Sequence, residues 1–83
     1  MDHYLFTARS VTHAQQMASI LARAGVPTKI RRVGAQALLR GCGYTLELPA
    51  RFYARARSEL SAAGQNPIRI FSVSSGRMSE VTP

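Results

Sequence analysis

Residues 12–33 read THAQQMASILARAGVPTKIRRV, and this stretch decides the fold because it holds a helix, the end of that helix and a strand. Small and apolar residues recur in it at the spacing of one helical face. They are Ala14, Met17, Ala18, Leu21 and Ala24. Gly25 stands where a helix-ending glycine takes up left-handed backbone, Val26 can supply the hydrophobic contact that follows, and Pro27 stops the helix. Residues 28–33 then predict a strand whose charge is typical of a sheet edge.

Upstream of this stretch, residues 3–7 (HYLFT) are aromatic and apolar, which favours a first strand. Ser10 and Thr12 are both good helix N-caps. Thr12 with Gln15 three residues later also matches the spacing of a capping box. The chain therefore passes from a strand into the helix within a few residues.

Downstream, residues 44–48 (YTLEL) alternate apolar and polar side chains, which indicates a strand with one buried face. Pro49 suits the first turn of a second helix, and Gly64 suits its end. The inner face of this helix is expected to carry Tyr53, Ala56, Leu60 and Ala63. Residues 68–73 (IRIFSV) predict the last strand.

The predicted order is strand, helix, strand, strand, helix, strand, which is the order of a ferredoxin-like βαββαβ sandwich. We therefore expect an α+β fold with a four-stranded antiparallel sheet and two helices on one face. Residues 1–73 would form this single domain, and the small polar residues 74–83 a flexible C-terminal tail.

The composition limits what the 83 residues can do. So short a chain forms one domain with little room for a large substrate cavity, so a carrier or binding module is expected rather than a complete enzyme. No apolar run reaches the roughly 18 residues of a membrane helix, and Asp2 stands where a signal peptide would carry basic charge. A single cysteine fits the reducing bacterial cytoplasm. The net charge of +7 indicates attraction to an anionic partner, although scattered arginines can also simply face water.

The one cysteine, Cys42, lies between Gly41 and Gly43 just before the third strand. Flanking glycines remove local side-chain cover, so the thiol is a candidate reactive group. In the predicted topology the loop that carries Cys42 lies at the same end of the sheet as the start of the first helix. A helix N-terminus and nearby cations raise the thiolate fraction of a cysteine. The residues expected to support the thiol there are Arg9, Ser10, Thr12, His13 and Arg40.

Two plainer interpretations stay open for these residues. A lone cysteine is often an inert small hydrophobe, and a histidine in the first turn of a helix is most often an exposed polar residue. Cys42 with two histidines does not reach the ligand count of a metal site, so neither a metal nor a cofactor is expected.

Four stretches of the chain together resemble a family of small bacterial proteins described as sulfur- or selenium-carrier-like. They are residues 4–7 (YLFT), residues 10–14, residues 24–27 (AGVP) and residues 42–49 (CGYTLELP). The resemblance covers about residues 3–73 and is carried by the order and spacing of these motifs. It implies that Cys42 holds sulfur or selenium as a persulfide or its selenium equivalent, with donor and acceptor proteins as partners. In this chain Leu39, Arg40 and Gly41 precede the cysteine, where family members commonly have proline and small polar residues.

Nucleic-acid binding is the alternative function, because ferredoxin-like sheets can stack bases on exposed aromatic rings. Tyr4, Phe6 and Tyr44 are expected to point toward the helices instead. The open face is expected to carry Leu5, Lys29, Arg31, Thr45, Glu47, Arg69 and Phe71. A small regulatory module is a third possibility, as a homodimer paired through the apolar strand 68–73.

Overall fold

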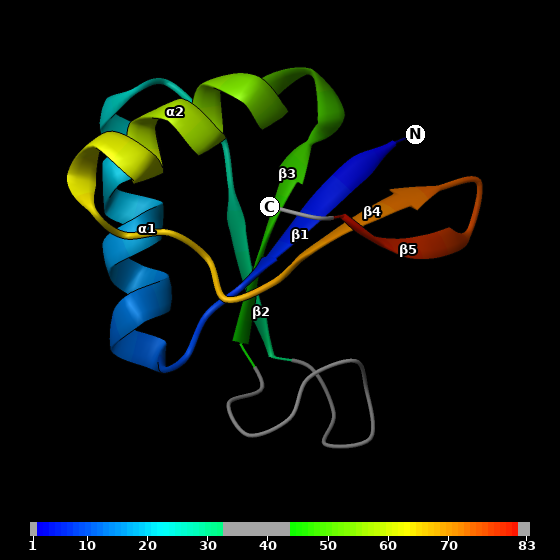
Figure 1. The fold of residues 1–83 in the computed structure, drawn as a ribbon, viewed down its shortest axis with the longest axis horizontal. Coiled ribbons are helices and arrows are strands. Elements are labelled where there is room, and N and C mark those ends of the chain that lie inside the picture. The colour runs from blue at the N-terminus through cyan, green and yellow to red at the C-terminus, as the bar shows by residue number, and fades with distance from the viewer. Residues whose placement is uncertain (1, 33–43, 82–83) are drawn as a thin grey trace.

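The computed structural model describes residues 2–32 and 44–81, which form two α-helices, a short 3-10 helix and five strands (Figure 1). The elements, in chain order, are β1 (His3–Thr7), α1 (Val11–Arg23), β2 (Lys29–Arg32), β3 (Tyr44–Pro49), η1 (Ala50–Phe52), α2 (Tyr53–Ala63), β4 (Ile70–Ser74) and β5 (Arg77–Val81). The α+β class expected from the sequence is confirmed. Neither helix in these two described stretches is long and apolar enough to cross a membrane.

The strands form one sheet in the order β2-β3-β1-β4-β5, and every neighbouring pair is antiparallel. The sheet therefore has five strands among the described residues, and the expectation of four is wrong. β2 lies at one edge, as its charge predicted. At one end of the sheet His3 of β1 pairs with Pro49, and at the other end Thr7 pairs with Thr45.

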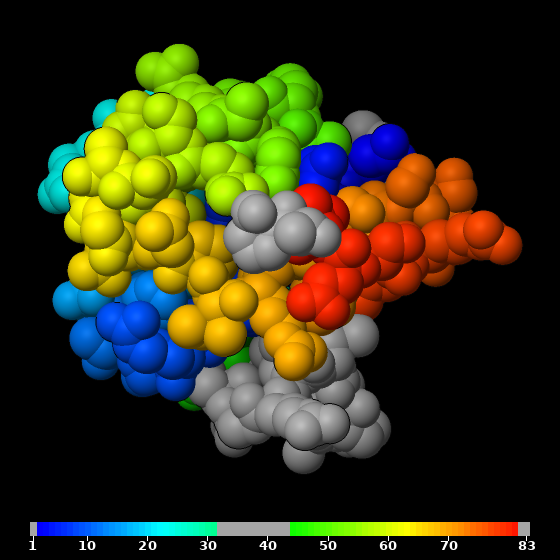
Figure 2. All heavy atoms as spheres, in the orientation of Figure 1, coloured from blue at the N-terminus to red at the C-terminus, as the bar shows by residue number. Residues whose placement is uncertain are grey.

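The extra strand, β5, lies where the sequence predicted a flexible tail, so that prediction is wrong for residues 77–81. Ser74 pairs with Arg77, which leaves a two-residue loop of Ser75 and Gly76 with φ angles of 52° and 77°. Two successive positive φ angles match the right-handed twist of a hairpin, and glycine tolerates them easily. The β4–β5 hairpin projects from the rest of the molecule in orange and red (Figure 2).

Both helices cover the same face of the sheet and enclose the core between the two layers (Figure 1). The largest fully buried apolar side chains come from every layer: Phe6, Leu46, Leu48 and Ile70 from the strands, and Met17, Leu21 and Leu60 from the helices. Tyr53 of α2 stacks on Tyr4 at 4.2 Å between ring centroids and meets Phe6 edge-on. The alternating pattern of β3 therefore buries the face that the sequence predicted.

Both helices end as predicted, with a glycine in left-handed backbone. At the end of α1, Gly25 has a φ of 80°, and the Val26 N–H donates to the Leu21 carbonyl at 2.8 Å. At the end of α2, Gly64 has a φ of 70°, and the Gln65 N–H donates to the Leu60 carbonyl at 3.0 Å. Both are bonds that a left-handed glycine allows at a helix end, and they pair backbone groups of the last turn.

The second helix begins later than the sequence predicted. Pro49 is the last residue of β3, η1 follows it, and α2 starts at Tyr53. Ala56 and Leu60 face the core, whereas Ala63, which was expected to face it too, is exposed.

Candidate functional site

The start of α1 is the part of the predicted site that the structure describes. Ser10 is the N-cap, and its Oγ accepts a hydrogen bond from the His13 N–H at 3.1 Å. The Arg9 N–H donates to Nδ1 of His13, also at 3.1 Å. Thr12, the other predicted cap, lies inside the helix and is exposed. The capping box expected from Thr12 and Gln15 is therefore wrong, and Ser10 caps the helix.

His13 is buried, with 1% of its surface exposed, so the expectation of a solvated histidine is wrong. Burial lowers the pKa of His13 below its ordinary value and the charge of Arg9 lowers it further, while the backbone of Asn66 acts in the opposite direction. Since Nδ1 accepts a hydrogen bond, the proton of the neutral ring is on Nε2. Nε2 is buried and has no partner that meets full hydrogen-bond geometry in the part of the chain that the structure describes. His13 is therefore a neutral packing residue that holds the Arg9 turn.

The sequence did contain a sign of this burial. His13 precedes Met17 by four residues, and Met17 precedes Leu21 by four, so all three lie on one stripe of the helix. This spacing was missed because histidine is a polar residue type, so His13 was not counted among the apolar positions of the helix. Arg9, on the other hand, is exposed beside the cap.

The residues nearest the proposed thiol, Arg40, Gly41, Cys42 and Gly43, lie outside the described residues. The structure does describe Tyr44, two positions after the cysteine. The carbonyl of Tyr44 accepts a hydrogen bond from the Ala8 N–H at 3.1 Å. This hydrogen bond joins Tyr44 to Ala8, which lies two residues before Ser10, at the end of the sheet where α1 begins.

The sheet face opposite the helices follows the register expected from the sequence. Leu5 pairs with Glu47 and Phe71, and Lys29 also pairs with Glu47, so these side chains share that face. Phe71 is the only Phe, Tyr or Trp of that face in the described strands, and it is 6% exposed. Base stacking of the kind that RNA-binding sheets use needs accessible rings, and this face offers none among the described residues.

The predicted dimer edge is not an edge in this fold. Ile70 and Phe71 of β4 pair with β1 on one side and with Val81 and Glu80 of β5 on the other. A second copy therefore has no unpaired backbone on β4 to bind, because β5 already occupies it. Nor does the described part of the chain bring together three side chains that could hold a metal ion.

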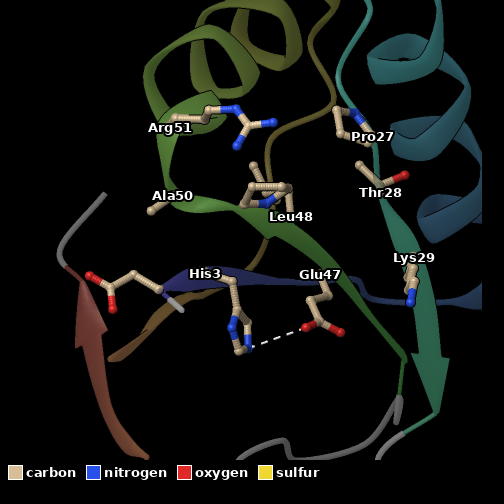
Figure 3. Close-up of a pocket in the computed structure, with 10 residues that line it drawn as sticks. His3, Pro27, Thr28, Lys29, Glu47, Leu48, Ala50 and Arg51 are labelled. Atoms are coloured by element: carbon tan, nitrogen blue, oxygen red, sulfur yellow. Dashed lines mark ion pairs between the residues drawn. The ribbon is translucent and has the colours of Figure 1, made fainter. Parts of the chain in front are cut away.

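A cleft of about 640 Å³ lies at the end of the sheet where His3 pairs with Pro49, opposite the end where α1 begins. The sequence did not predict this cleft. Figure 3 shows Arg51 extending above Leu48 toward Pro27, with Lys29 on β2 and the His3–Glu47 pair below. His3 Nε2 is 3.4 Å from a Glu47 carboxylate oxygen, and Arg31 also binds this carboxylate. One sequence signal could have indicated the cleft. Pro27 lies two residues before β2 and Pro49 is the last residue of β3, and proline at both places limits how far these strands can pair.

Comparison of the chain with protein-family models, with curated proteins and with solved structures found no match.

Proposed function

We propose that this protein is a sulfur or selenium carrier with a ferredoxin-like fold, in which the Cys42 thiolate takes the atom from a donor and passes it to an acceptor protein. The single observation that carries the proposal is the hydrogen bond between Ala8 and Tyr44. It supports a position for Cys42 near the start of α1, because Cys42 precedes Tyr44 by only two residues.

The strand order supports the ferredoxin-like part of the proposal. Without β5, the sheet reads β2-β3-β1-β4 with both helices on one face, which is the arrangement of two interleaved β-α-β units. β5 is then an addition at the β4 edge. In this arrangement the chain from β2 to β3 starts and ends at the same end of the sheet as the α1 N-terminus.

The electrostatics at that end favour a reactive thiol. The first turn of α1 carries a partial positive charge from its backbone N–H groups, and Arg9 adds a full one beside it. His13 adds none at neutral pH, because its lowered pKa keeps it uncharged. Among the described residues, the cation that would raise the thiolate fraction of Cys42 is therefore Arg9. His13, which the sequence also suggested, is not one, and Arg40 lies outside the described residues.

The transfer itself is an exchange. The Cys42 thiolate attacks the outer sulfur of a donor persulfide, R–S–SH, the donor S–S bond breaks, and the donor leaves as a thiolate. The transferred sulfur keeps its proton and now forms an S–S bond with Cys42. No net oxidation occurs, and an acceptor thiolate can remove the sulfur by the same step. The positive charge of the chain would attract acidic partners.

The test is sulfur uptake by the reduced native protein from glutathione persulfide, read by intact-protein mass spectrometry without reductant. Wild type should gain the mass of one sulfur atom, and the Cys42→Ser variant should gain none. Cys42 is the only cysteine, so uptake by Cys42→Ser, or no uptake by the native wild type, would contradict the proposal.

A pair of arginine variants tests the surroundings of the thiol. Arg9→Gln should slow the uptake several-fold near neutral pH, because it removes the cation nearest the α1 N-terminus. Arg77→Gln is the matched control, since it removes the same charge from the distant β4–β5 hairpin. Equal rates of sulfur uptake for the two variants would show that the start of α1 does not influence the thiol.

A further inference from the structure

We infer that the cleft between the start of β2 and the end of β3 binds a small organic anion, with a carboxylate or phosphate group on an apolar, preferably aromatic, body. The cleft is separate from the proposed thiol site. It lies at the end of the sheet where His3 pairs with Pro49, whereas α1 begins at the end where Thr7 pairs with Thr45.

The cleft exists because the β2–β3 ladder cannot continue. Its last pair is Lys29 with Glu47, and the same register would next place Thr28 opposite Leu48 and Pro27 opposite Pro49. Proline has no N–H to donate, so two opposed prolines cannot extend the ladder. The two segments are therefore free to separate beyond Lys29, and the cleft opens there and extends past the end of β3 to Asp2 and His3.

The walls of the cleft are largely apolar. Pro27, Leu48, Pro49 and Ala50 line it, and because Leu48 is only 1% exposed, the accessible apolar surface comes mainly from the two prolines and Ala50. Rigid proline rings suit a flat hydrocarbon body, since they lose little conformational freedom when it binds. A volume of about 640 Å³ is within the range of small-molecule sites.

Two cations, Arg51 and Lys29, and two carboxylates, Asp2 and Glu47, line the cleft, so an anion would be held by one particular cation and not by a net positive charge. Both carboxylates that line it already have partners, because Glu47 binds Arg31 and His3, and Asp2 accepts a hydrogen bond from the Ser74 hydroxyl at 3.0 Å. All four acidic residues of the chain lie in the described residues, and none forms an ion pair with Arg51 or Lys29.

The two cations are not equivalent. Arg51 extends over the apolar wall toward Pro27, with its guanidinium carbon 4.9 Å from the centroid of the Phe52 ring (Figure 3). Lys29 is paired with Glu47 in the β2–β3 ladder, so the negative charge of Glu47 offsets part of the positive potential of Lys29. Arg51 is therefore the main anchor for the anionic group, and its planar donors fit a carboxylate or phosphate. Lys29 adds a weaker attraction.

The experiment is a titration of the full chain, followed by amide chemical shifts, with benzoate and phenyl phosphate as the probes. Benzyl alcohol tests the apolar body without the charge, and inorganic phosphate tests the charge without the body. Both aromatic anions should give saturable shifts at the cleft amides of Thr28, Lys29, Leu48, Ala50 and Arg51. The two half-probes should each bind at least about tenfold more weakly, as the loss of one charge-assisted hydrogen bond or of the apolar contact predicts.

Three variants assign the binding to the cleft. Arg51→Gln should weaken phenyl phosphate about tenfold, and Lys29→Gln by about threefold. Arg55→Gln is the matched control, because it removes an exposed arginine from α2 outside the cleft and should leave the affinity unchanged. All three positions are on the surface, and the amide spectra of the variants show directly whether each one is folded.

Several outcomes would overturn the inference. One is equal binding of benzyl alcohol and benzoate, and another is equal binding of inorganic phosphate and phenyl phosphate. Shifts at amides outside the cleft, no saturable shift at all, or equal weakening by Arg55→Gln and Arg51→Gln would each do the same. Sulfur uptake at Cys42 is measured separately, so failure of either proposal leaves the other standing.

Discussion

At the scale of single residues, His13 shows how burial changes the role of a side chain. Solvated at the surface, it would carry a positive charge at slightly acidic pH. In this fold its Nδ1 accepts from the Arg9 N–H, its Nε2 has no hydrogen-bond partner within residues 2–32 and 44–81, and its ring is enclosed. Protonation would take the acceptor away from Arg9 and place a second positive charge beside its guanidinium. The folded protein therefore favours the neutral ring.

This preference predicts a loss of stability in acid. The pKa of His13 is lower in the folded chain than its ordinary value of 6.5, so below about pH 6.5 the unfolded chain binds more protons than the folded one. The stabilising effect of the neutral ring is complete above the unfolded pKa and is lost as the pH falls toward the folded pKa. Urea unfolding of wild type should thus show a lower free energy of unfolding at about pH 5.5 than at about pH 7.5.

Variants separate this histidine from other titrating groups. His13→Asn should be less stable than wild type at neutral pH but should lose less on acidification. The His3→Asn variant removes the other histidine, which lies beside Glu47, and should still lose free energy of unfolding on acidification because His13 is intact. If His13→Asn and wild type lose the same free energy of unfolding between the two pH values, His13 is not the group responsible.

At the scale of elements, different causes set the two ends of α1. The C-terminus follows from glycine itself, because left-handed backbone at Gly25 excludes most other residues and needs no tertiary contact. The N-terminus had two chemically suitable caps, Ser10 and Thr12. The Ser10 side chain accepts the His13 N–H, and burial of His13 sets the rotation of the helix that makes this possible.

The choice of cap predicts unequal effects of two similar substitutions. Ser10→Ala should lower the free energy of unfolding by about 1 kcal/mol, because the His13 N–H loses its partner. Thr12→Ala should change it by less than about 0.5 kcal/mol or raise it slightly, since an exposed helical position favours alanine. Chemical denaturation of the two variants under identical conditions measures both. A larger loss for Thr12→Ala would mean that Thr12 is the true cap.

At the scale of the whole molecule, β5 changes which surfaces are available. It pairs along the full length of β4, so the described sheet presents β2 and β5 as its edges. Val81 of β5 also packs against the core and pairs with Ile70. The last strand thus contributes to the stability of the domain as well as covering the edge that a dimer would have used.

Removal of residues 77–83 should therefore lower the free energy of unfolding by roughly 2 kcal/mol or more, through lost ladder hydrogen bonds and exposed apolar surface. Glu80→Gln is the control within the strand. It removes only the exposed ion pair with Arg69, at 3.9 Å, and should cost less than about 1 kcal/mol. Urea unfolding measures both changes. A truncated chain as stable as the full one, together with rapid amide exchange at Ser79 and Val81 of the full chain, would show that residues 77–81 form a flexible tail after all.

Several elements could be predicted from the sequence because their signals are local. The spacing of Ala14, Met17 and Leu21 gave the inner face of α1, Gly25 and Gly64 gave the two helix ends, and the alternation in residues 44–48 gave the buried face of β3. These features depend on backbone freedom and on side-chain periodicity, and both can be read from neighbouring residues.

Other features depend on distant partners and became visible only in the folded chain. β5 buries little of its own surface and is held mainly by its ladder to β4, so its residues carry no apolar alternation, and the Ser75-Gly76 turn was its only local sign. The burial of His13 depends on how α1 rotates against the sheet. The cleft depends on the register that ends the β2–β3 ladder at Lys29 and Glu47, just before Pro27 and Pro49 would meet. In each case the deciding contact joins residues that the chain order does not place together, and for that reason the sequence alone could not supply it.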